Sequence, residues 1–252
     1  MAENKKKVHF IIERQDGPNS KPYTEEFEVD YRPALNVVAC LMEIQKNPVT
    51  KDGKKTTAPV WECNCLEKVC GACTMVINGK VQQACSALID HLQQPIRLAP
   101  ARTFPVIRDL HIDRTLMFEN LKRIQGWVKV DGTWEVHNDA PRQNPRVAQE
   151  AYEISRCMTC GCCMEACPNV NPGSDFIGPQ PLGQVHLFNL HPIGEYFKED
   201  RLNAIMAKGG IASCGNSQNC VQACPKEIKL TTYIAKLNRE TNKQALKNLF
   251  NK

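Results

Sequence analysis

The feature that most constrains this chain is a pair of cysteine runs in its second half, CMTCGCCMEACP (157–168) and CGNSQNCVQACP (214–225). The first run has the spacing C-x2-C-x2-C-x3-C-P, at which cysteine thiolates hold cubane iron–sulfur clusters. Overlaid at an offset of 57 residues (214 against 157), both runs end in Cys-Pro, and Ser217 occupies the place of Cys160. The overlay indicates two related metal sites, one of which lacks a thiolate.

Where two such runs occur in one protein, the fourth cysteine of each run ligates the cluster of the other. The pattern therefore predicts one complete and one incomplete set of ligands. The complete set, for a [4Fe–4S] cluster, is Cys157, Cys160, Cys163 and Cys224. The incomplete set is Cys167, Cys214 and Cys220, with Ser217 at the vacant corner.

Ser217 decides which cluster the incomplete set would hold. A [4Fe–4S] cubane needs a ligand on every iron, so three thiolates favour a [3Fe–4S] cluster. The alternative is that the Ser217 hydroxyl ligates a fourth iron as an alkoxide. A hydroxyl is a hard ligand that ionises reluctantly, whereas these irons sit among soft thiolates, and three irons are therefore favoured.

The composition sets the environment of these thiols. The chain has 14 cysteines in 252 residues, with 42% hydrophobic and 23% charged residues, which is typical of soluble globular proteins. Its start, MAENKKKVHF, lacks the apolar stretch of a secretory signal, and no segment approaches the roughly 18 apolar residues of a transmembrane helix. We therefore expect a cytoplasmic protein, in which clustered thiols bind metal more often than they form disulfides. The net charge of +5 is modest and scattered, so nucleic acid is not an expected partner.

A third group of cysteines lies in the first half, in WECNCLEKVCGACTMVINGKVQQAC (61–85). Its spacing, C-x4-C-x2-C with a fourth cysteine further on, is that of plant-type [2Fe–2S] sites. The predicted ligands are Cys65, Cys70, Cys73 and Cys85. Gly71 has no Cβ, which would let backbone N–H groups approach the cluster sulfurs. Zinc is the alternative, but structural zinc sites usually pair C-x2-C knuckles.

Three cysteines fall outside these spacings. Cys63 is interpreted as a spare thiol, and Cys162 as a residue next to the ligands that does not itself bind iron. Cys40 lies within an apolar helical pattern and is interpreted as a small buried hydrophobic residue.

The two halves also differ in their expected secondary structure. The first half predicts strands at 8–14, 25–30 and 94–100, a helix at 34–46, and a hairpin with Asn78-Gly79 at its turn. The second half predicts helices near 113–125, 145–156, 195–207 and 226–239. A small α+β domain over 1–105, followed by a nearly all-helical domain over 106–252, is the expected organisation.

These three cluster types, in this chain order, resemble the iron–sulfur subunits of succinate dehydrogenase and fumarate reductase. The resemblance covers nearly the whole chain and includes VIRDLHIDRTLMFENL (106–121) and FIGPQPL (176–182). It implies a β-grasp plant-type ferredoxin domain followed by an all-α bacterial-type ferredoxin domain. It also implies that the [2Fe–2S], [4Fe–4S] and [3Fe–4S] clusters pass single electrons onward in that order.

The resemblance further implies the partners and the location. Electrons would come from the FAD of a flavoprotein subunit that oxidises succinate, and would leave to quinone through a membrane-anchoring cytochrome b subunit. The chain itself would carry electrons, without a catalytic acid, base or dicarboxylate site. It would lie on the cytoplasmic side of the cell membrane, held by the anchor.

One departure bears on the quinone. In ubiquinone-reducing members a tryptophan pair follows the Cys-Pro of the complete run, and a histidine follows the first cysteine of the other run. Here NVNP (169–172) follows Pro168, and Gly215 follows Cys214. This favours a menaquinone-type enzyme with electrons passing to haem. The alternatives left open are a quinol:fumarate reductase, a subunit of another respiratory complex such as a heterodisulfide-reductase-like enzyme, and a non-redox zinc-binding module.

Overall fold

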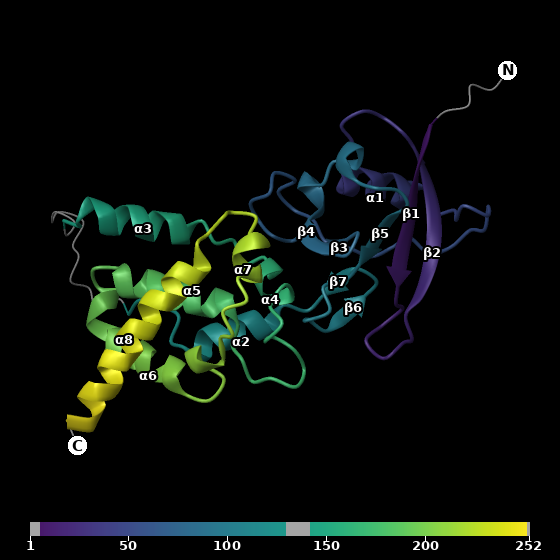
Figure 1. Ribbon diagram of the computed structural model, residues 1–252. Coiled ribbons are helices and arrows are strands. Elements are labelled where there is room, and N and C mark those ends of the chain that lie inside the picture. Colours follow the sequence, from purple (N-terminus) through teal and green to yellow (C-terminus); the bar gives the residue numbers. More distant parts are fainter. Residues whose placement is uncertain (1–5, 130–141, 251–252) are drawn as a thin grey trace. The chain divides into compact units, whose positions relative to one another are not determined.

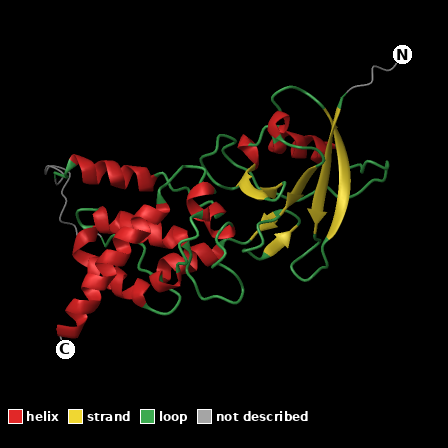
Figure 2. Ribbon diagram, in the orientation of Figure 1, coloured by secondary structure: helices red, strands yellow, loops and turns green. Residues whose placement is uncertain are grey.

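The computed structural model describes residues 6–129 and 142–250, which fall into two compact units (Figure 1). Unit 1 comprises Met1–Arg114 and Met158–Glu165, and unit 2 comprises Thr115–Cys157 and Ala166–Lys252. Within the described ranges every strand belongs to unit 1, whereas unit 2 is built from helices and loops (Figure 2). This agrees with the expected α+β class.

Unit 1 is built on a five-stranded sheet of order β2-β1-β5-β3-β4, in which β1 and β5 are parallel and the other neighbours antiparallel. Its strands are β1 Lys7–Arg14, β2 Tyr23–Asp30, β3 Thr74–Ile77, β4 Lys80–Gln83 and β5 Ile96–Ala99. The smaller elements are η1 Ala84–Ser86, η2 Ile89–His91, the ribbon of β6 Val106–Arg108 with β7 His111–Ile112, and the short helix α4 Cys162–Glu165.

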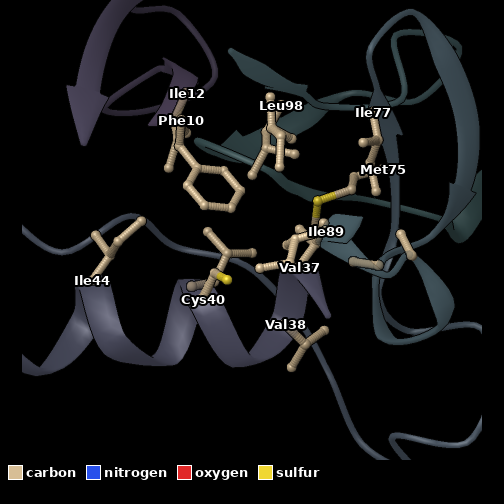
Figure 3. Close-up of a cluster of buried hydrophobic side chains, with 14 of the residues drawn as sticks. Phe10, Ile12, Val37, Val38, Cys40, Ile44, Met75, Ile77, Ile89 and Leu98 are labelled. Atoms are coloured by element: carbon tan, nitrogen blue, oxygen red, sulfur yellow. The ribbon is translucent and has the colours of Figure 1, made fainter. Parts of the chain in front are cut away.

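Helix α1 (Val37–Lys46) packs its apolar side on this sheet, as in a β-grasp domain (Figure 3). Asn36 caps it, because its side chain accepts a hydrogen bond from the backbone N–H of Ala39 at 2.8 Å. Strand β1 alternates, so Phe10 and Ile12 point into the core. Cys40 is fully buried there, and burial raises its pKa to about 12. Its interpretation as a buried hydrophobic residue is confirmed.

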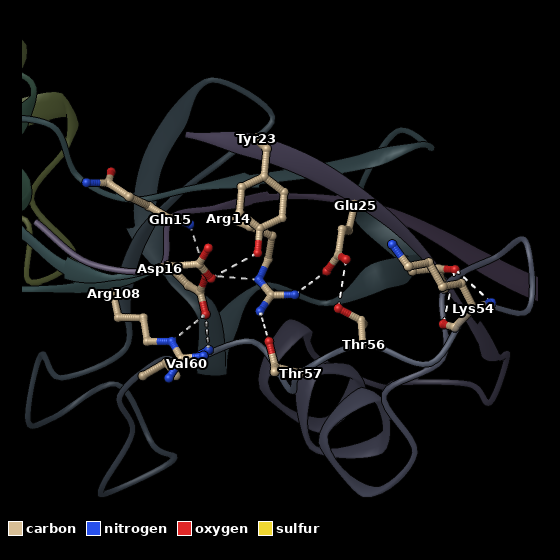
Figure 4. Close-up of polar contacts among 12 residues, drawn as sticks. Arg14, Gln15, Asp16, Tyr23, Glu25, Lys54, Thr56, Thr57, Val60 and Arg108 are labelled. Atoms are coloured by element: carbon tan, nitrogen blue, oxygen red, sulfur yellow. Dashed lines mark hydrogen bonds and ion pairs between the residues drawn. The ribbon is translucent and has the colours of Figure 1, made fainter. Parts of the chain in front are cut away.

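A buried ion-pair network holds the segment that leads to the first cysteine loop (Figure 4). Arg14 Nε donates to Asp109 Oδ1 at 2.9 Å, and its other nitrogens donate to Glu25 and Thr57. Asp109 also accepts the backbone N–H of Val60 at 2.8 Å. Burial disfavours the Arg14 cation, but the bond and charge of Asp109 outweigh it and raise its pKa. The network fixes residues 57–60, just before the cysteines.

Unit 2 is built around a central helix, α5 (Pro179–Leu190). This helix packs against α2, α3, α6 and α8. The surrounding elements are α2 Thr115–Arg123, α3 Pro145–Ser155, η3 Gly194–Phe197, α6 Lys198–Met206, η4 Ile211–Ser213, α7 Asn219–Gln222 and α8 Leu230–Phe250. Most of α5 is buried, and a Cβ on Gly183 would lie 2.9 Å from a Leu230 side-chain carbon. None of the helices within residues 6–129 and 142–250 has the length and apolar character needed to cross a membrane.

The strands and the hairpin were predicted at the observed places, and so were α1, α2, α3 and α6 within a few residues. Helix α5, the β6–β7 ribbon and the short helices α4 and α7 were not predicted. Helix α5 begins Pro-Gln-Pro and is buried nearly all round, so it lacks the one-sided apolar pattern that marks a surface helix. The β6–β7 ribbon is too short to leave a periodic signal. Helix α8 was expected at 226–239 but begins at Leu230 and continues to Phe250.

Candidate iron–sulfur cluster sites

In unit 1 the loop from Cys65 to Cys73 directs backbone N–H groups at cysteine sulfurs. The Cys65 Sγ accepts from the N–H groups of Glu67 (3.5 Å), Val69 (3.3 Å) and Cys70 (3.2 Å). These three bonds stabilise the thiolate and lower the pKa of Cys65 to about 7. A thiolate is the form that binds iron, so this position is prepared for ligation by the backbone itself.

The backbone of this loop can form the N–H cluster because it repeatedly turns left-handed. Leu66 (φ 61°), Lys68 (φ 58°) and Gly71 (φ 75°) all have positive φ. Alternation of this kind makes a concave nest of N–H groups, which binds anions. Leu66 and Lys68 have side chains, so the left-handed conformation costs them conformational free energy. No feature of the sequence marked Leu66 or Lys68 for this role.

The other thiols of unit 1 complete the group. Cys70 Sγ accepts from the N–H of Cys65 (3.5 Å) and of Ala72 (3.4 Å), and Cys73 Sγ accepts from the N–H of Cys85 (3.5 Å). Burial raises the pKa of Cys73 to about 12; the N–H of Cys85 opposes this shift and the thiol of Cys85 adds to it. Metal binding would favour ionisation of such a thiol. The four predicted ligands therefore lie together, and their donor set fits a [2Fe–2S] cluster.

Cys63 lies beside this group. Burial and the nearby thiols of Cys70, Cys85 and Cys65 raise its pKa. The spacing rule interpreted Cys63 as a spare thiol, and its geometry makes it a neighbour of the predicted ligands. The spare-thiol interpretation stays a prediction.

Gly71 has a second requirement that the sequence did not reveal. A Cβ at this position would lie 2.7 Å from Cys160 Cβ and 2.8 Å from Cys160 Cα, both in unit 1. The Gly71 carbonyl is held by Arg114, whose Nη1 donates to it at 2.9 Å. The loop of the first site therefore packs directly on a residue of the first cysteine run.

In unit 2 the incomplete set is gathered. Burial raises the pKa of Cys167, and the thiol of Cys214 raises it further, while the N–H groups of Asn169 and Val170 oppose both effects. Burial and the thiols of Cys167 and Cys214 raise the pKa of Cys220 to about 11. Two buried cysteines whose pKa values are raised by burial and by neighbouring thiols match a site in which iron supplies the compensating positive charge.

Two asparagines join the two cysteine runs in unit 2. Asn169 Nδ2 donates to the carbonyl of Ser213 at 2.6 Å, and Asn219 Nδ2 donates to the carbonyl of Ala166 at 3.1 Å. The Asn219 bond joins the two runs, and Asn169 and Ser213 each adjoin one run, so the overlay predicted from the sequence corresponds to spatial proximity. Crossed ligation requires this proximity.

Ser217 lies on the exposed part of the second run, between Asn216 (φ 55°) and Gln218 (φ 64°), both left-handed. A pocket of about 630 Å³ opens beside this turn. It is lined by Cys214, Asn216, Gln218, Thr231, Thr232, Ile234, Ala235, Lys236, Asn238 and Arg239. Ser217 itself is exposed, and its role as the vacant corner stays a prediction.

The complete set is divided between the units. Cys160 and Cys163 are buried in unit 1, and Cys157 and Cys224 belong to unit 2, where Cys224 Sγ accepts the N–H of Ile228 at 3.4 Å. Their assignment to one [4Fe–4S] cluster stays a prediction. Within residues 6–129 and 142–250, no three Cys, His, Asp or Glu side chains are arranged to hold a single metal ion. Cluster ligands bind different irons, so they need not converge on one point.

Two protein families match the chain, one in each half. Residues 9–119 match the family described as 2Fe-2S iron-sulfur cluster binding domain, and residues 153–228 match the 4Fe-4S dicluster domain. Each matched range contains the cysteine spacing that predicted the corresponding cluster type.

Relatives match along nearly the whole length. The succinate dehydrogenase iron-sulfur subunit of Bacillus subtilis (strain 168) is 59% identical over 97% of this chain and 96% of its own. The fumarate reductase iron-sulfur subunit of Wolinella succinogenes is 30% identical over 88% of this chain and 90% of its own. Among solved structures, a chain of the Mycobacterium smegmatis Sdh1 complex in the apo form has a TM-score of 0.80 at 20% identity, covering 95% of this chain and 97% of that chain. That likeness shows a common fold.

Proposed function

The chain belongs to the family of succinate dehydrogenase and fumarate reductase iron–sulfur subunits, and we propose that it is the electron-transfer subunit of a membrane-bound succinate:menaquinone oxidoreductase. The observation that carries the proposal is the trio of Cys167, Cys214 and Cys220 in unit 2, with a serine in the fourth place of its run. The plant-type cysteine loop comes first in the chain and the three-thiol site comes later. This order of cluster sites distinguishes the family.

The chain's own residues would bind and insulate the clusters. Clusters on these ligands supply one-electron redox chemistry, so a pair of electrons from a flavin can be passed on singly. The N–H groups of Glu67, Val69 and Cys70 face Cys65 in fixed positions, and such dipoles stabilise the charge of a ligated cluster without moving. Cys73 and Cys220 are buried, which keeps water from their sulfurs.

A flavoprotein subunit and a membrane anchor are the proposed partners. The loop around Cys65 presents two exposed apolar side chains, Leu66 (48% exposed) and Val69 (54% exposed). Apolar side chains beside a redox site suit a docking surface for the electron donor. The FAD of the flavoprotein subunit would be the donor to this site.

The finer assignment is a cytochrome b anchor, menaquinone as the acceptor, and a position on the cytoplasmic side of the membrane. It is supported by the residues that follow Pro168 and Cys214, where the aromatic residues of ubiquinone-reducing relatives are absent. Asn169 instead bonds the Ser213 carbonyl and lies against Gly215, where a Cβ would be 3.1 Å from Asn169 Nδ2. This position serves to join the two cysteine runs, so the quinone would bind in the anchor.

A quinol:fumarate reductase is the second candidate, favoured by the 30% identity to the Wolinella succinogenes subunit. The two enzymes share their ligands and differ in cluster potentials and quinone. Succinate oxidation and fumarate reduction by the assembled complex, assayed with menaquinone and ubiquinone analogues, would separate them. Faster fumarate reduction would favour the second candidate, and efficient ubiquinone reduction would contradict the menaquinone assignment.

An iron count with electron paramagnetic resonance (EPR) of the oxidised complex tests the clusters themselves. We expect about nine irons in this chain, from one cluster of each type, and a signal from an oxidised three-iron cluster. About ten irons without that signal would make Ser217 a ligand.

Ser217→Cys is the matched variant for this test, because it restores the missing thiolate of the second run. It is expected to convert the three-iron signal into that of a reducible four-iron cluster and to raise the iron content by about one per chain. A Ser217→Ala variant should keep three irons. If Ser217→Cys also keeps three irons, the vacancy is not set by this residue.

A further inference from the structure

Gln83 connects a predicted ligand of the first cluster with the first cysteine run, inside unit 1. Its Oε1 accepts from the Cys73 thiol, with 3.6 Å between Oε1 and Sγ, and its Nε2 donates to Cys162 Sγ at 3.3 Å. Cys162 is in turn hydrogen-bonded to the side chain of Cys160, a predicted ligand of the second cluster. The amide of one side chain thus spans the space between two ligand groups.

Strand register places Gln83 at this point. The Asn78-Gly79 turn, with both residues at positive φ (48° and 78°), joins β3 to β4 and pairs Thr74 with Gln83 directly across the strands. Cys73 precedes Thr74 and Cys85 follows two residues after Gln83, so the hairpin carries ligands at both of its ends. Gln83 is 1% exposed and Thr74 3% exposed, so solvent does not screen their dipoles.

The direction of the Gln83 amide is fixed by a hydrogen-bond chain. The Thr74 hydroxyl donates its only hydrogen to the Gly71 carbonyl at 2.8 Å, because a carbonyl can only accept. The Thr74 oxygen must therefore accept from Gln83, and the group found at 2.7 Å is the amide nitrogen Nε2. The two hydrogens of Nε2 go to Thr74 and Cys162, which leaves the amide oxygen facing Cys73.

We propose that Gln83 is a positioning residue for electron transfer, whose locked amide dipole lowers the reduction potential at the Cys73 site and raises it at the Cys160 site. The inference rests on the proposed function. The negative end of the dipole faces the ligand of the first cluster, so an added electron there is disfavoured. The positive end faces Cys162, which lies against Cys160, so an added electron on that side is favoured.

The two shifts together make electron transfer from the [2Fe–2S] site to the [4Fe–4S] site more favourable. With both clusters held by these ligands, one electron would pass from the reduced [2Fe–2S] cluster to the oxidised [4Fe–4S] cluster, with no bond broken and no proton moved. Cluster potentials respond to hydrogen bonds at their sulfurs, and a fixed dipole in a buried place acts without reorganisation. Cys162, interpreted from the sequence only as a residue that does not bind iron, becomes the contact through which Gln83 acts on Cys160.

The test is an EPR-monitored redox titration of the assembled complex carrying Gln83→Leu. The expected result is an upward shift of the [2Fe–2S] potential together with a downward shift of the [4Fe–4S] potential. Gln82→Leu is the matched control, because Gln82 is its neighbour on β4 and faces the other side of the strand. That control should move neither potential.

Thr74→Val provides an independent arm, since it removes the acceptor that locks the amide while Arg114 still donates to the Gly71 carbonyl. The amide can then turn its nitrogen toward Cys73, and the [2Fe–2S] potential should rise by more than in Gln83→Leu. If the Gln83→Leu complex does not assemble its clusters, the potentials of Thr74→Val test the role of Gln83 instead.

The outcomes separate the inference from the proposed function. Failure of the unmodified complex to hold the three clusters would overturn the proposed function. With the clusters present, unchanged potentials in Gln83→Leu and Thr74→Val, or shifts of the opposite sign, would overturn the role of Gln83. Loss of the [4Fe–4S] signal in Cys162→Ala would contradict it as well, because Cys162 would then be a ligand.

Discussion

The site around Cys65 in unit 1 and the trio around Cys220 in unit 2 stabilise thiolates in different ways. The first gathers three of its cysteines in one short loop whose own N–H groups surround Cys65. The second takes its cysteines from two distant runs, where burial and neighbouring thiols raise the pKa values of Cys167 and Cys220. At the first site the loop's own N–H groups favour the Cys65 thiolate, whereas at the second site the positive charge of bound iron would offset the mutual effect of the thiols. Four predictions follow this contrast, from the largest expected effect to the smallest.

Thiol labelling of the iron-free, folded protein should separate the sites most strongly. Cys65, with a pKa of about 7, is half ionised at neutral pH, whereas Cys220, with a pKa of about 11, is almost wholly protonated. Because the thiolate is the reactive form, Cys65 should be alkylated faster by on the order of a thousandfold at pH 7. Its rate should fall as the pH drops below 7, while that of Cys220 should still rise above pH 10. Mass spectrometry of quenched samples measures both rates, and equal rates would contradict the contrast.

Arg14→Met should damage the first site without the second. It removes Arg14 from the fully buried Asp109 carboxylate, which keeps only the longer ion pair with Arg108 (3.9 Å), so the expected cost is at the lower end of about 3–5 kcal/mol. Residues 57–60 then lose their anchor, so we expect loss of the [2Fe–2S] EPR signal and a lower unfolding midpoint. The three-iron signal of unit 2 should persist.

The control for Arg14→Met is Arg32→Met, since Arg32 pairs with Glu43 on the surface. Exposed pairs contribute about 0–1 kcal/mol, so this variant should keep both signals. Loss of both signals in Arg14→Met alone would show that the two sites do not fail separately.

Gly71→Ala tests the close approach to Cys160. The new methyl group meets two Cys160 atoms below 3 Å, and the backbone is left-handed, so a loss of about 2–4 kcal/mol is expected. Gly79→Ala has nearly the same φ with open space around its Cβ, so it should cost only the backbone term of about 1–2 kcal/mol. Unfolding curves of the two variants isolate the packing contribution. Equal losses would mean that Cys160 does not crowd Gly71.

Asn169→Ala should have the smallest effect and should affect only unit 2. It removes the 2.6 Å bond between the cysteine runs and leaves the Ser213 carbonyl without this donor, at about 1–2 kcal/mol. The EPR signal of the three-iron cluster should become weaker, or be lost more easily when the complex is diluted. The [2Fe–2S] EPR signal should stay unchanged. Asn171→Ala, which removes only local bonds to the Pro168 carbonyl and from the Gly173 N–H, is the control. A weakened [2Fe–2S] signal would contradict the separation of the sites.

Much of the molecule could be predicted because its signals are local. Cysteine spacing indicated three groups of thiols, and two of these groups are gathered in the structure, while the [4Fe–4S] set stays a prediction. Aromatic and β-branched residues predicted β1, and Asn78-Gly79 predicted the hairpin. Helix α5 was not predicted, because a helix buried nearly all round carries no one-sided pattern. The role of Gln83 could not be predicted either, because it depends on the residues that lie opposite this strand position in the folded protein.

The sequence by itself determined the types of metal site and the family, because thiolate ligation depends on residue identity and spacing along the chain. Only the tertiary structure decided how the thiols are stabilised: the left-handed turns at Leu66 and Lys68, the close contact of Gly71 with Cys160, and the direction of the Gln83 amide. Dipoles and steric contacts act through space over a few ångströms, and the residues that supply them come from segments that the chain brings together only on folding.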